Sequence, residues 1–181
     1  MRYYLFPGSF KPPHKGHVKI LIDLIKKQKN KDFKIIIIIS KKSRKLDNNK
    51  RKVITAGQSL KIFKIYIKEI DEKFRLKNNI SVFVSKKTSP LLDIYDILRK
   101  LDKKSNKVFL IKSKKDKNNK RFQMFNRIKT IKILPMKEIK DIHSTNFRKY
   151  INKKNLLMIN KYLSNKLKEI NRKKILKILK I

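Results

Sequence analysis

The sequence predicts an α/β protein built on a doubly wound, parallel, five-stranded sheet with helices on both faces. Apolar runs rich in β-branched residues alternate with amphipathic runs along most of the chain, which is typical of such a sheet. The most apolar run, residues 34–40, holds five isoleucines in succession, as expected for a strand covered on both sides. No break in composition splits the chain, so we expect one sheet.

The individual elements follow from their apolar spacing and from their capping residues. Apolar runs predict strands at residues 2–6, 34–40, 80–85, 107–111 and 129–134. Amphipathic runs predict helices at residues 16–29, 56–69, 89–101, 121–125 and 144–151. Thr55 is a good N-cap for the second helix, and Ser89-Pro90 places proline at the first position of the third. Residues 41–52 and 135–142 lack an apolar pattern and predict loops.

The C-terminal residues 156–181 form a basic amphipathic tail, with apolar residues at three- and four-residue steps. We expect residues 1–155 to form the main domain and residues 156–181 a helical extension packed on it or beside it. A helix lying on a membrane surface is the alternative. We favour a helix that packs on the core and turns its basic face to solvent.

Composition excludes several classes of protein. The 181 residues are 40% hydrophobic and include no cysteine, so a buried core is expected, whereas disulfides and thiolate metal sites are excluded. No apolar run approaches the ~18 residues of a membrane span. The N-terminus lacks a basic segment followed by a long apolar one, which predicts a cytoplasmic protein without a secretory signal.

The formal net charge of +39 has two interpretations. A surface this basic attracts polyanions, nucleic acid above all, and also nucleotides. Lysine, asparagine and isoleucine also share A/T-rich codons, so biased codon usage produces the same composition. We favour codon bias as the main cause, because the charge is spread over the chain rather than gathered on one stripe or tail.

The loop after the first strand gathers residue types that are rare elsewhere in the chain. Residues 6–17 (FPGSFKPPHKGH) hold two of the three glycines, three of the five prolines and two of the three histidines. A first strand-to-helix turn is where α/β proteins bind phosphates, because free N–H groups of the helix point out of it. The sequence contains neither the P-loop pattern nor G-x-G-x-x-G.

Within this loop, Gly8 permits a tight turn and Gly16 leaves room at the helix start. His14 and His17 are three residues apart, so they lie on one side of the helix and can donate hydrogen bonds to phosphate oxygens. A zinc site is disfavoured, because His143 is the only other histidine and cysteine is absent.

This segment resembles the His-x-Gly-His signature of the cytidylyltransferase-like nucleotidyltransferase superfamily. The histidine motif, residues 14–17, follows a Gly-Ser-Phe turn between a predicted strand and a predicted helix. Members include nicotinamide and nicotinate mononucleotide adenylyltransferases, phosphopantetheine adenylyltransferase and several cytidylyltransferases. The resemblance implies a Rossmann-like fold.

A second segment supports the resemblance. Residues 141–148 (DIHSTNFR) are similar to the late Ile-Ser-Ser-Thr-x-x-Arg motif of the superfamily, with His143 in place of the first serine. Ser144 and Thr145 can cap the following helix, and Arg148 can reach a phosphate one turn further on. Residues 54–66 and 113–122 also resemble phage- and virus-type members. Together the resemblance covers residues 2–151.

The resemblance implies transfer of a nucleoside monophosphate from a nucleoside triphosphate to a phosphate-bearing acceptor, with release of pyrophosphate. It assigns His14 and His17 to the triphosphate and to the charge that develops on it, and Lys11 to the acceptor phosphate, although a solvated lysine is the alternative for Lys11. The nucleotide-binding residues that it implies are Gly8, Ser9, Phe10, Gly16, Ser144, Thr145 and Arg148. It also implies Mg²⁺ that is held mostly by phosphates and water, with no protein residue as metal ligand.

The nucleotide and its acceptor stay open at this point. Pro12-Pro13 favours the mononucleotide adenylyltransferase branch, whereas Pro7 to Phe10 is also similar to the phosphopantetheine branch. Lys11 stands where both branches commonly have an acidic residue. ATP is favoured over CTP, and the alternatives are a cytidylyltransferase acting on a small phosphorylated alcohol and a basic nucleic-acid-binding protein on a degenerate nucleotidyltransferase fold. Self-association as a homo-oligomer is left open.

Overall fold

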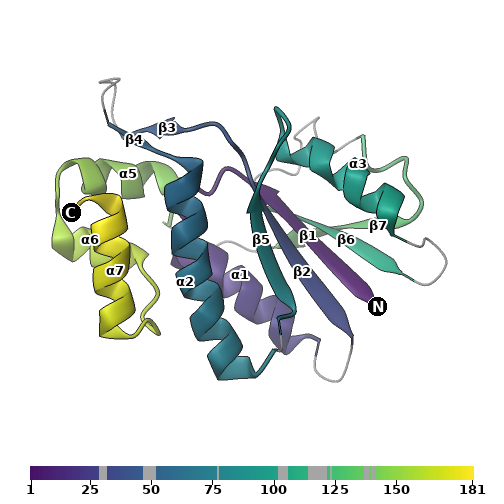
Figure 1. The fold of residues 1–181 in the computed structure, drawn as a ribbon, viewed down its shortest axis with the longest axis horizontal. Helices are drawn as coiled ribbons and strands as arrows, with labels where there is room; N and C mark the ends of the chain where they lie inside the picture. Colours follow the sequence, from purple (N-terminus) through teal and green to yellow (C-terminus); the bar gives the residue numbers. More distant parts are fainter. Residues whose placement is uncertain are drawn as a thin grey trace.

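A five-stranded parallel sheet forms the centre of the protein (Figure 1). The computed structural model describes residues 1–28, 32–46, 52–76, 78–101, 106–113, 122, 124–136, 139 and 142–181. The strands are β1 (Arg2–Gly8), β2 (Phe33–Ile39), β5 (Ile80–Val84), β6 (Lys107–Ser113) and β7 (Ile131–Met136). Every pairing in this sheet is parallel, and the spatial order is β5-β2-β1-β6-β7. This confirms the predicted Rossmann-like sheet.

The strand order places a switch point beside β1. The chain moves outward from β1 to β2 and β5 and then returns to β6 on the other side of β1. At such a reversal the connections leave the carboxyl ends of two neighbouring strands in opposite directions, and the crevice between them is where open α/β sheets bind ligands.

Helices cover both faces of the sheet because successive side chains of a strand point to opposite sides. In β1, Tyr4 and Phe6 join the core under α1 (Lys15–Lys26) and α2 (Ala56–Phe74), whereas Leu5 joins the core under α3 (Pro90–Lys100). The isoleucines of β2 divide in the same way. Both faces of β2 are therefore buried, which explains its uninterrupted apolar run.

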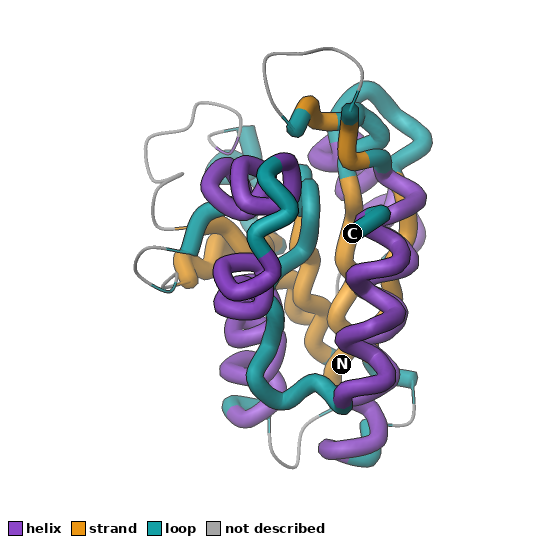
Figure 2. Tube along the Cα trace, turned by 90° about the vertical axis from the view of Figure 1, so that its left-hand side faces the viewer, coloured by secondary structure: helices purple, strands orange, loops and turns teal. Residues whose placement is uncertain are grey.

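The C-terminal part forms α5 (Ser144–Asn152), α6 (Leu156–Tyr162) and α7 (Glu169–Leu179). These helices stand on the α2 side of the molecule, and they face the viewer in Figure 2. Gln58 Nε2 of α2 donates to the Ile178 carbonyl at 2.8 Å. Ile175 and Leu179 are buried in the core that α1 and α2 share. The tail thus packs on the core with its apolar face.

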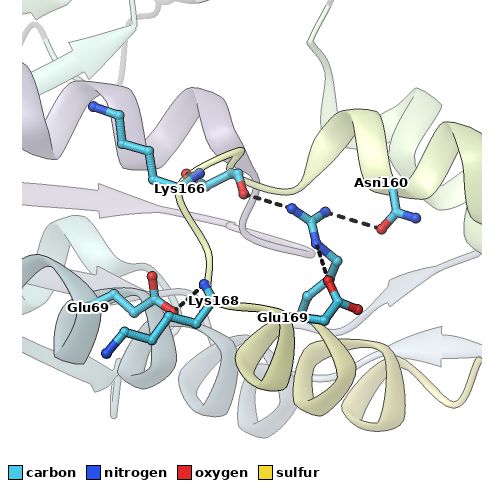
Figure 3. Close-up of polar contacts among 7 residues, drawn as sticks. Glu69, Asn160, Lys166, Lys168 and Glu169 are labelled. Carbon is cyan, nitrogen blue, oxygen red and sulfur yellow. Dashed lines mark hydrogen bonds and ion pairs between the residues drawn. The ribbon is translucent and has the colours of Figure 1, made fainter.

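Polar contacts fix the start of α7 (Figure 3). A carboxylate oxygen of Glu69 accepts hydrogen bonds from the Lys168 backbone N–H at 2.9 Å and from the Asn171 amide at 2.6 Å. The Arg172 guanidinium donates to Asn160 Oδ1 at 3.2 Å, and so ties α7 to α6. The link between the helices is therefore anchored on α2.

The structure differs from the sequence prediction in several places. Residues 41–52 were predicted as a loop, but β3 (Arg44–Lys45) lies within them and pairs antiparallel with β4 (Val53–Ile54). This pairing is only two residues long, and of its four residues only Ile54 is buried, so it leaves no apolar periodicity in the sequence. Helix α2 continues to Phe74, five residues beyond the predicted end, and this last part still packs on the core through Ile70 and Phe74.

The similarity at residues 113–122 lies largely outside the described residues, and so do Arg121 and Gln123 of the predicted helix at residues 121–125 and Asp141 of the late motif. Among the helices of the described part of the chain, none is long and apolar enough to cross a membrane.

Candidate active site

The loop between β1 and α1 is built around the buried ring of Phe10. Its backbone lies in the left-handed region, with φ of 50°, and its ring makes edge-to-face contacts with Phe6, His17 and Phe63 at centroid distances of 5.0 to 5.1 Å. A Cβ added to Gly8 would lie 2.6 Å from this ring. Glycine is therefore required at residue 8 for the loop to close over Phe10.

His14 and His17 cap the start of α1 with their own side chains. The Nδ1 atom of His14 accepts the Gly16 backbone N–H at 3.2 Å, and the Nδ1 atom of His17 accepts the His14 backbone N–H at 3.2 Å. In a neutral ring whose Nδ1 is an acceptor, the proton sits on Nε2. Each imidazole therefore has Nε2–H as a donor for a ligand.

The two imidazoles stack face to face, with centroids 3.8 Å apart and planes inclined by 27°. The His14 ring also lies over Gly16, where an added Cβ would be 3.0 Å from it. The glycine of the histidine motif thus makes room for the first histidine ring.

Both histidines are held in the neutral form. Burial lowers the pKa of His17 from 6.5 to about 3. The pKa of His14 is also lowered well below its usual value, first by burial and then by the neighbouring His17 and His143. At neutral pH the site therefore has two uncharged donors rather than two imidazolium ions.

A cavity of about 280 Å³ opens beside these rings. It brings together seven of the predicted site residues, which are Gly8, Ser9, Phe10, His14, Gly16, His17 and Ser144. Ile111 and Lys112 of β6 complete the wall on the other side of the switch point. Among the described residues, no aspartate or glutamate lines it and no cluster of metal-ligating side chains occurs.

Lys11 does not line this cavity and is completely buried. Its ammonium group donates to the Ser9 carbonyl at 2.9 Å and to the Ser40 carbonyl at 2.7 Å. Burial, and to a smaller extent the charge of Arg44, lower the pKa of Lys11 to about 8. In this structure Lys11 fastens the loop to the end of β2.

Arg148 connects the two motifs. Its guanidinium donates to the Lys11 carbonyl at 2.9 Å and to Thr145 Oγ1 at 3.2 Å. Burial and the charge of Arg44 lower its pKa. Arg148 and Thr145 do not line the cavity themselves, but Arg148, Lys11 and Arg44 form a group of three neighbouring cations next to it.

The start of α5 corrects one expectation. His143, not Ser144 or Thr145, is the N-cap residue, and it makes no side-chain capping hydrogen bond. Ser144 is the first helical residue and faces the cavity, as does His143. The sequence marked His143 only as a departure from the motif.

Sequence reasoning also missed two other residues near the site. Arg44 comes from the short β3–β4 pair. Tyr162 of α6 places its ring edge-on against His14 at a centroid distance of 6.3 Å. No local sequence pattern marks either residue, because only the tertiary fold brings them to the site.

A family model confirms the family that the two motifs indicate. The model for cytidylyltransferase-like proteins matches residues 5–150, which include both motifs. The chain belongs to this family. The match begins within β1, includes the other four strands of the sheet and ends within α5, so α6 and α7 lie beyond it.

Solved structures share this fold. The chain is similar to nicotinic acid mononucleotide adenylyltransferase of Plasmodium falciparum complexed with NaAD, with 14% identity, a TM-score of 0.56 and 91% of each chain covered. It is similar to the same enzyme complexed with APC, with 14% identity, a TM-score of 0.57, and 91% of this chain and 90% of that chain covered. No curated protein matches the sequence.

Proposed function

We propose that this protein is a nucleotidyltransferase that transfers AMP from ATP to a phosphate-bearing acceptor such as nicotinate or nicotinamide mononucleotide and releases pyrophosphate. The observation that carries the proposal is the stacked pair His14 and His17, whose Nδ1 atoms are engaged by the backbone and whose Nε2–H groups remain as donors beside the cavity at the switch point.

In this reaction an oxygen of the acceptor phosphate attacks the α-phosphorus, and the bond from that phosphorus to the bridging oxygen of pyrophosphate breaks. Negative charge then grows on the departing oxygens. The fixed Nε2–H donors meet that charge without reorganisation, which is the main way in which such sites lower a barrier. His14 and His17 are positioned for this by the capping hydrogen bonds.

The cation group formed by Lys11, Arg44 and Arg148 supports the binding of anions at the same end of the sheet. None of the three has an acidic partner among the ion pairs of the described residues. Burial first, and then repulsion by the charge of Arg44, disfavour the charged forms of Lys11 and Arg148. A phosphate bound near them would relieve that repulsion, and Arg44, which is exposed, is free to move toward it.

In the proposed reaction, Mg²⁺ binds together with the nucleotide. The described residues offer no carboxylate around the cavity, which fits Mg²⁺ held by phosphates and water better than a protein cage. Bound there, Mg²⁺ would neutralise charge on the triphosphate. The residues of this chain supply the hydrogen bonds and the orientation.

The test measures pyrophosphate release and product mass with ATP or CTP, Mg²⁺ and a panel of acceptors. The panel contains nicotinate mononucleotide, nicotinamide mononucleotide, phosphopantetheine and glycerol 3-phosphate. We expect turnover with ATP and a mononucleotide. Turnover with CTP and glycerol 3-phosphate alone would instead establish a cytidylyltransferase.

The matched variants are His17→Asn and Lys19→Ala. Asparagine can keep the capping acceptor while the imidazole donor is lost, so turnover should fall by about 100-fold or more. Lys19 is on the same helix, is exposed and pairs with Asp23, so its replacement should leave turnover unchanged. Equal activity of both variants would refute the role of His17.

Binding of nucleic acid is the second candidate, and the net charge of +39 favours it. It predicts strongly salt-dependent binding of DNA or RNA. Such binding without turnover on any acceptor would replace the enzymatic proposal. Self-association is a separate prediction, which sedimentation equilibrium tests.

A further inference from the structure

A second concave site lies outside the candidate active site, between the start of α2 and the end of α7. Its volume is about 1030 Å³, against about 280 Å³ for the cavity beside the histidines, and the two share no lining residue. The β3–β4 pair and the end of α5 complete its wall, at one end of the helix layer (Figure 1). Gln58, which donates to the Ile178 carbonyl at 2.8 Å, joins its two helices.

Two kinds of side chain dominate this site, which we call the α2–α7 groove. One kind is exposed lysine, at Lys52, Lys61, Lys64, Lys154, Lys174, Lys177 and Lys180. The other is aliphatic, at Leu46, Val53, Ile54, Ile65, Ile151, Ile178 and Leu179. Among the described residues, no acidic side chain and no aromatic ring lines the groove. None of these lysines takes part in the ion pairs between described residues.

The charges of α2 and α7 are sorted along the helix pair. The acids of the two helices are Glu69, Asp71 and Glu72 near the end of α2 and Glu169 at the start of α7. At that end, Glu69 accepts a hydrogen bond from the Lys168 backbone (Figure 3), and Glu72 pairs with the Lys168 ammonium at 2.7 Å. At the groove end, residues 56–68 and 170–179 contain no acid. Codon bias raises the number of lysines, but it does not sort the acids to one end.

Charge complementarity calls for an anionic occupant, and the aliphatic residues between the lysines call for one with an apolar face. Single-stranded nucleic acid stacks its bases on aromatic rings, and duplex phosphates need no apolar surface. An anionic bilayer meets protruding apolar side chains, whereas those of the groove line a concave surface. An acidic amphipathic helix carries spaced carboxylates beside an apolar stripe, and such helices bind in apolar grooves.

We propose that the α2–α7 groove is a docking site for an acidic amphipathic helix of a partner protein. Its carboxylates pair with the lysines, and its apolar side chains pack on Val53, Ile65 and Ile178. The proposal is independent of the proposed function, because the groove and the active-site cavity have no residue in common. The α7 wall lies beyond the family match at residues 5–150, so this part of the groove belongs to the C-terminal extension.

The test is fluorescence anisotropy of the intact protein with a labelled helical peptide of leucine and glutamate, about 16 residues long. A second peptide has glutamine in place of glutamate. The groove variant is Lys64→Ala with Lys177→Ala. The matched control is Lys68→Ala with Lys173→Ala, which removes the same charge from the same two helices at exposed positions outside the groove.

We expect the groove variant to bind the glutamate peptide about tenfold more weakly than the wild type, because two charge-assisted contacts are lost. The matched control should stay within about twofold. The glutamine peptide should bind the wild type at least tenfold more weakly than the glutamate peptide. Val53→Ser should weaken binding about threefold, because it removes apolar contact area. Excess α,β-methylene-ATP should not displace the peptide.

Equal losses in the groove variant and the matched control would mean attraction by net charge alone and would overturn the proposal. So would a wild-type protein that binds neither peptide, or both equally well. An oligothymidylate of similar length, or vesicles of phosphatidylserine and phosphatidylcholine, may replace the peptide as probe. Tighter binding of either, weakened only in the groove variant, would assign the groove to nucleic acid or to membrane instead.

Discussion

Acidification should destabilise this protein through the same histidines that form its site. In the folded state burial holds the pKa of His17 at about 3, against 6.5 when the ring is exposed. Between these values the unfolded chain binds a proton that the folded chain does not bind. Stability therefore falls as the pH drops from about 6.5 towards about 3, and it is complete only above that window.

The size of the effect follows from the two pKa values. A drop from pH 7 to pH 5 should cost about 1–2 kcal/mol through His17 alone, the lower figure allowing for solvent that reaches the ring through the cavity. His14 acts in the same direction, because its pKa is also lowered. Urea unfolding followed by circular dichroism at the two pH values measures the change.

The matched variant is His17→Asn, which keeps a capping acceptor and cannot titrate in this range. Carboxylates contribute alike to both proteins, so the difference between them reports His17 together with the part of the His14 pKa shift that His17 causes. We expect a smaller loss of stability on acidification in the variant. The same loss in both proteins, or a His17 ring that titrates near pH 6.5 by NMR, would refute the reasoning.

Three further substitutions test the loop and its supports. Gly8→Ala places a methyl group 2.6 Å from the Phe10 ring, so we expect a loss of about 1–3 kcal/mol in thermal unfolding, as for other overpacked sites, and at least tenfold lower turnover. Lys11→Met leaves two backbone carbonyls without their donor, which should cost about 1–3 kcal/mol in urea unfolding; an equally stable variant would contradict this. Tyr162→Leu removes the ring that lies edge-on to His14, so kcat should fall while Tyr162→Phe, which keeps the ring, retains wild-type kcat.

The sheet could be predicted because its signals are local. Five isoleucines in a row require a strand buried on both faces, and the structure covers β2 on both sides. Helices α2 and α3 begin where Thr55 and Ser89 predict, because each side chain accepts a backbone N–H of its own first turn. Such capping depends on residues two or three positions apart, which a sequence shows directly.

The features of the site that the sequence did not predict depend on contacts between distant parts of the chain. The burial of Lys11 follows from the Ser40 carbonyl, 29 residues away, and nothing near Lys11 in the sequence marks that partner. Tyr162 reaches His14 only because α6 folds back over α5. The histidine spacing predicted one shared side, but not that each ring caps the helix with Nδ1.

The positively charged side chains of this protein are of two kinds, exposed and buried. An exposed lysine costs little in free energy, so codon bias alone can populate the surface with lysine. A buried ammonium group is costly unless it is hydrogen-bonded, yet Lys11 is fully buried, bound by two carbonyls, and next to the partly buried Arg148. Burial, and then repulsion by the charge of Arg44, lower the pKa of Lys11 and of Arg148, and neutral methionine or glutamine at either position would avoid both effects. The cations beside the site therefore need an explanation other than composition, and a bound phosphate that offsets their repulsion provides one.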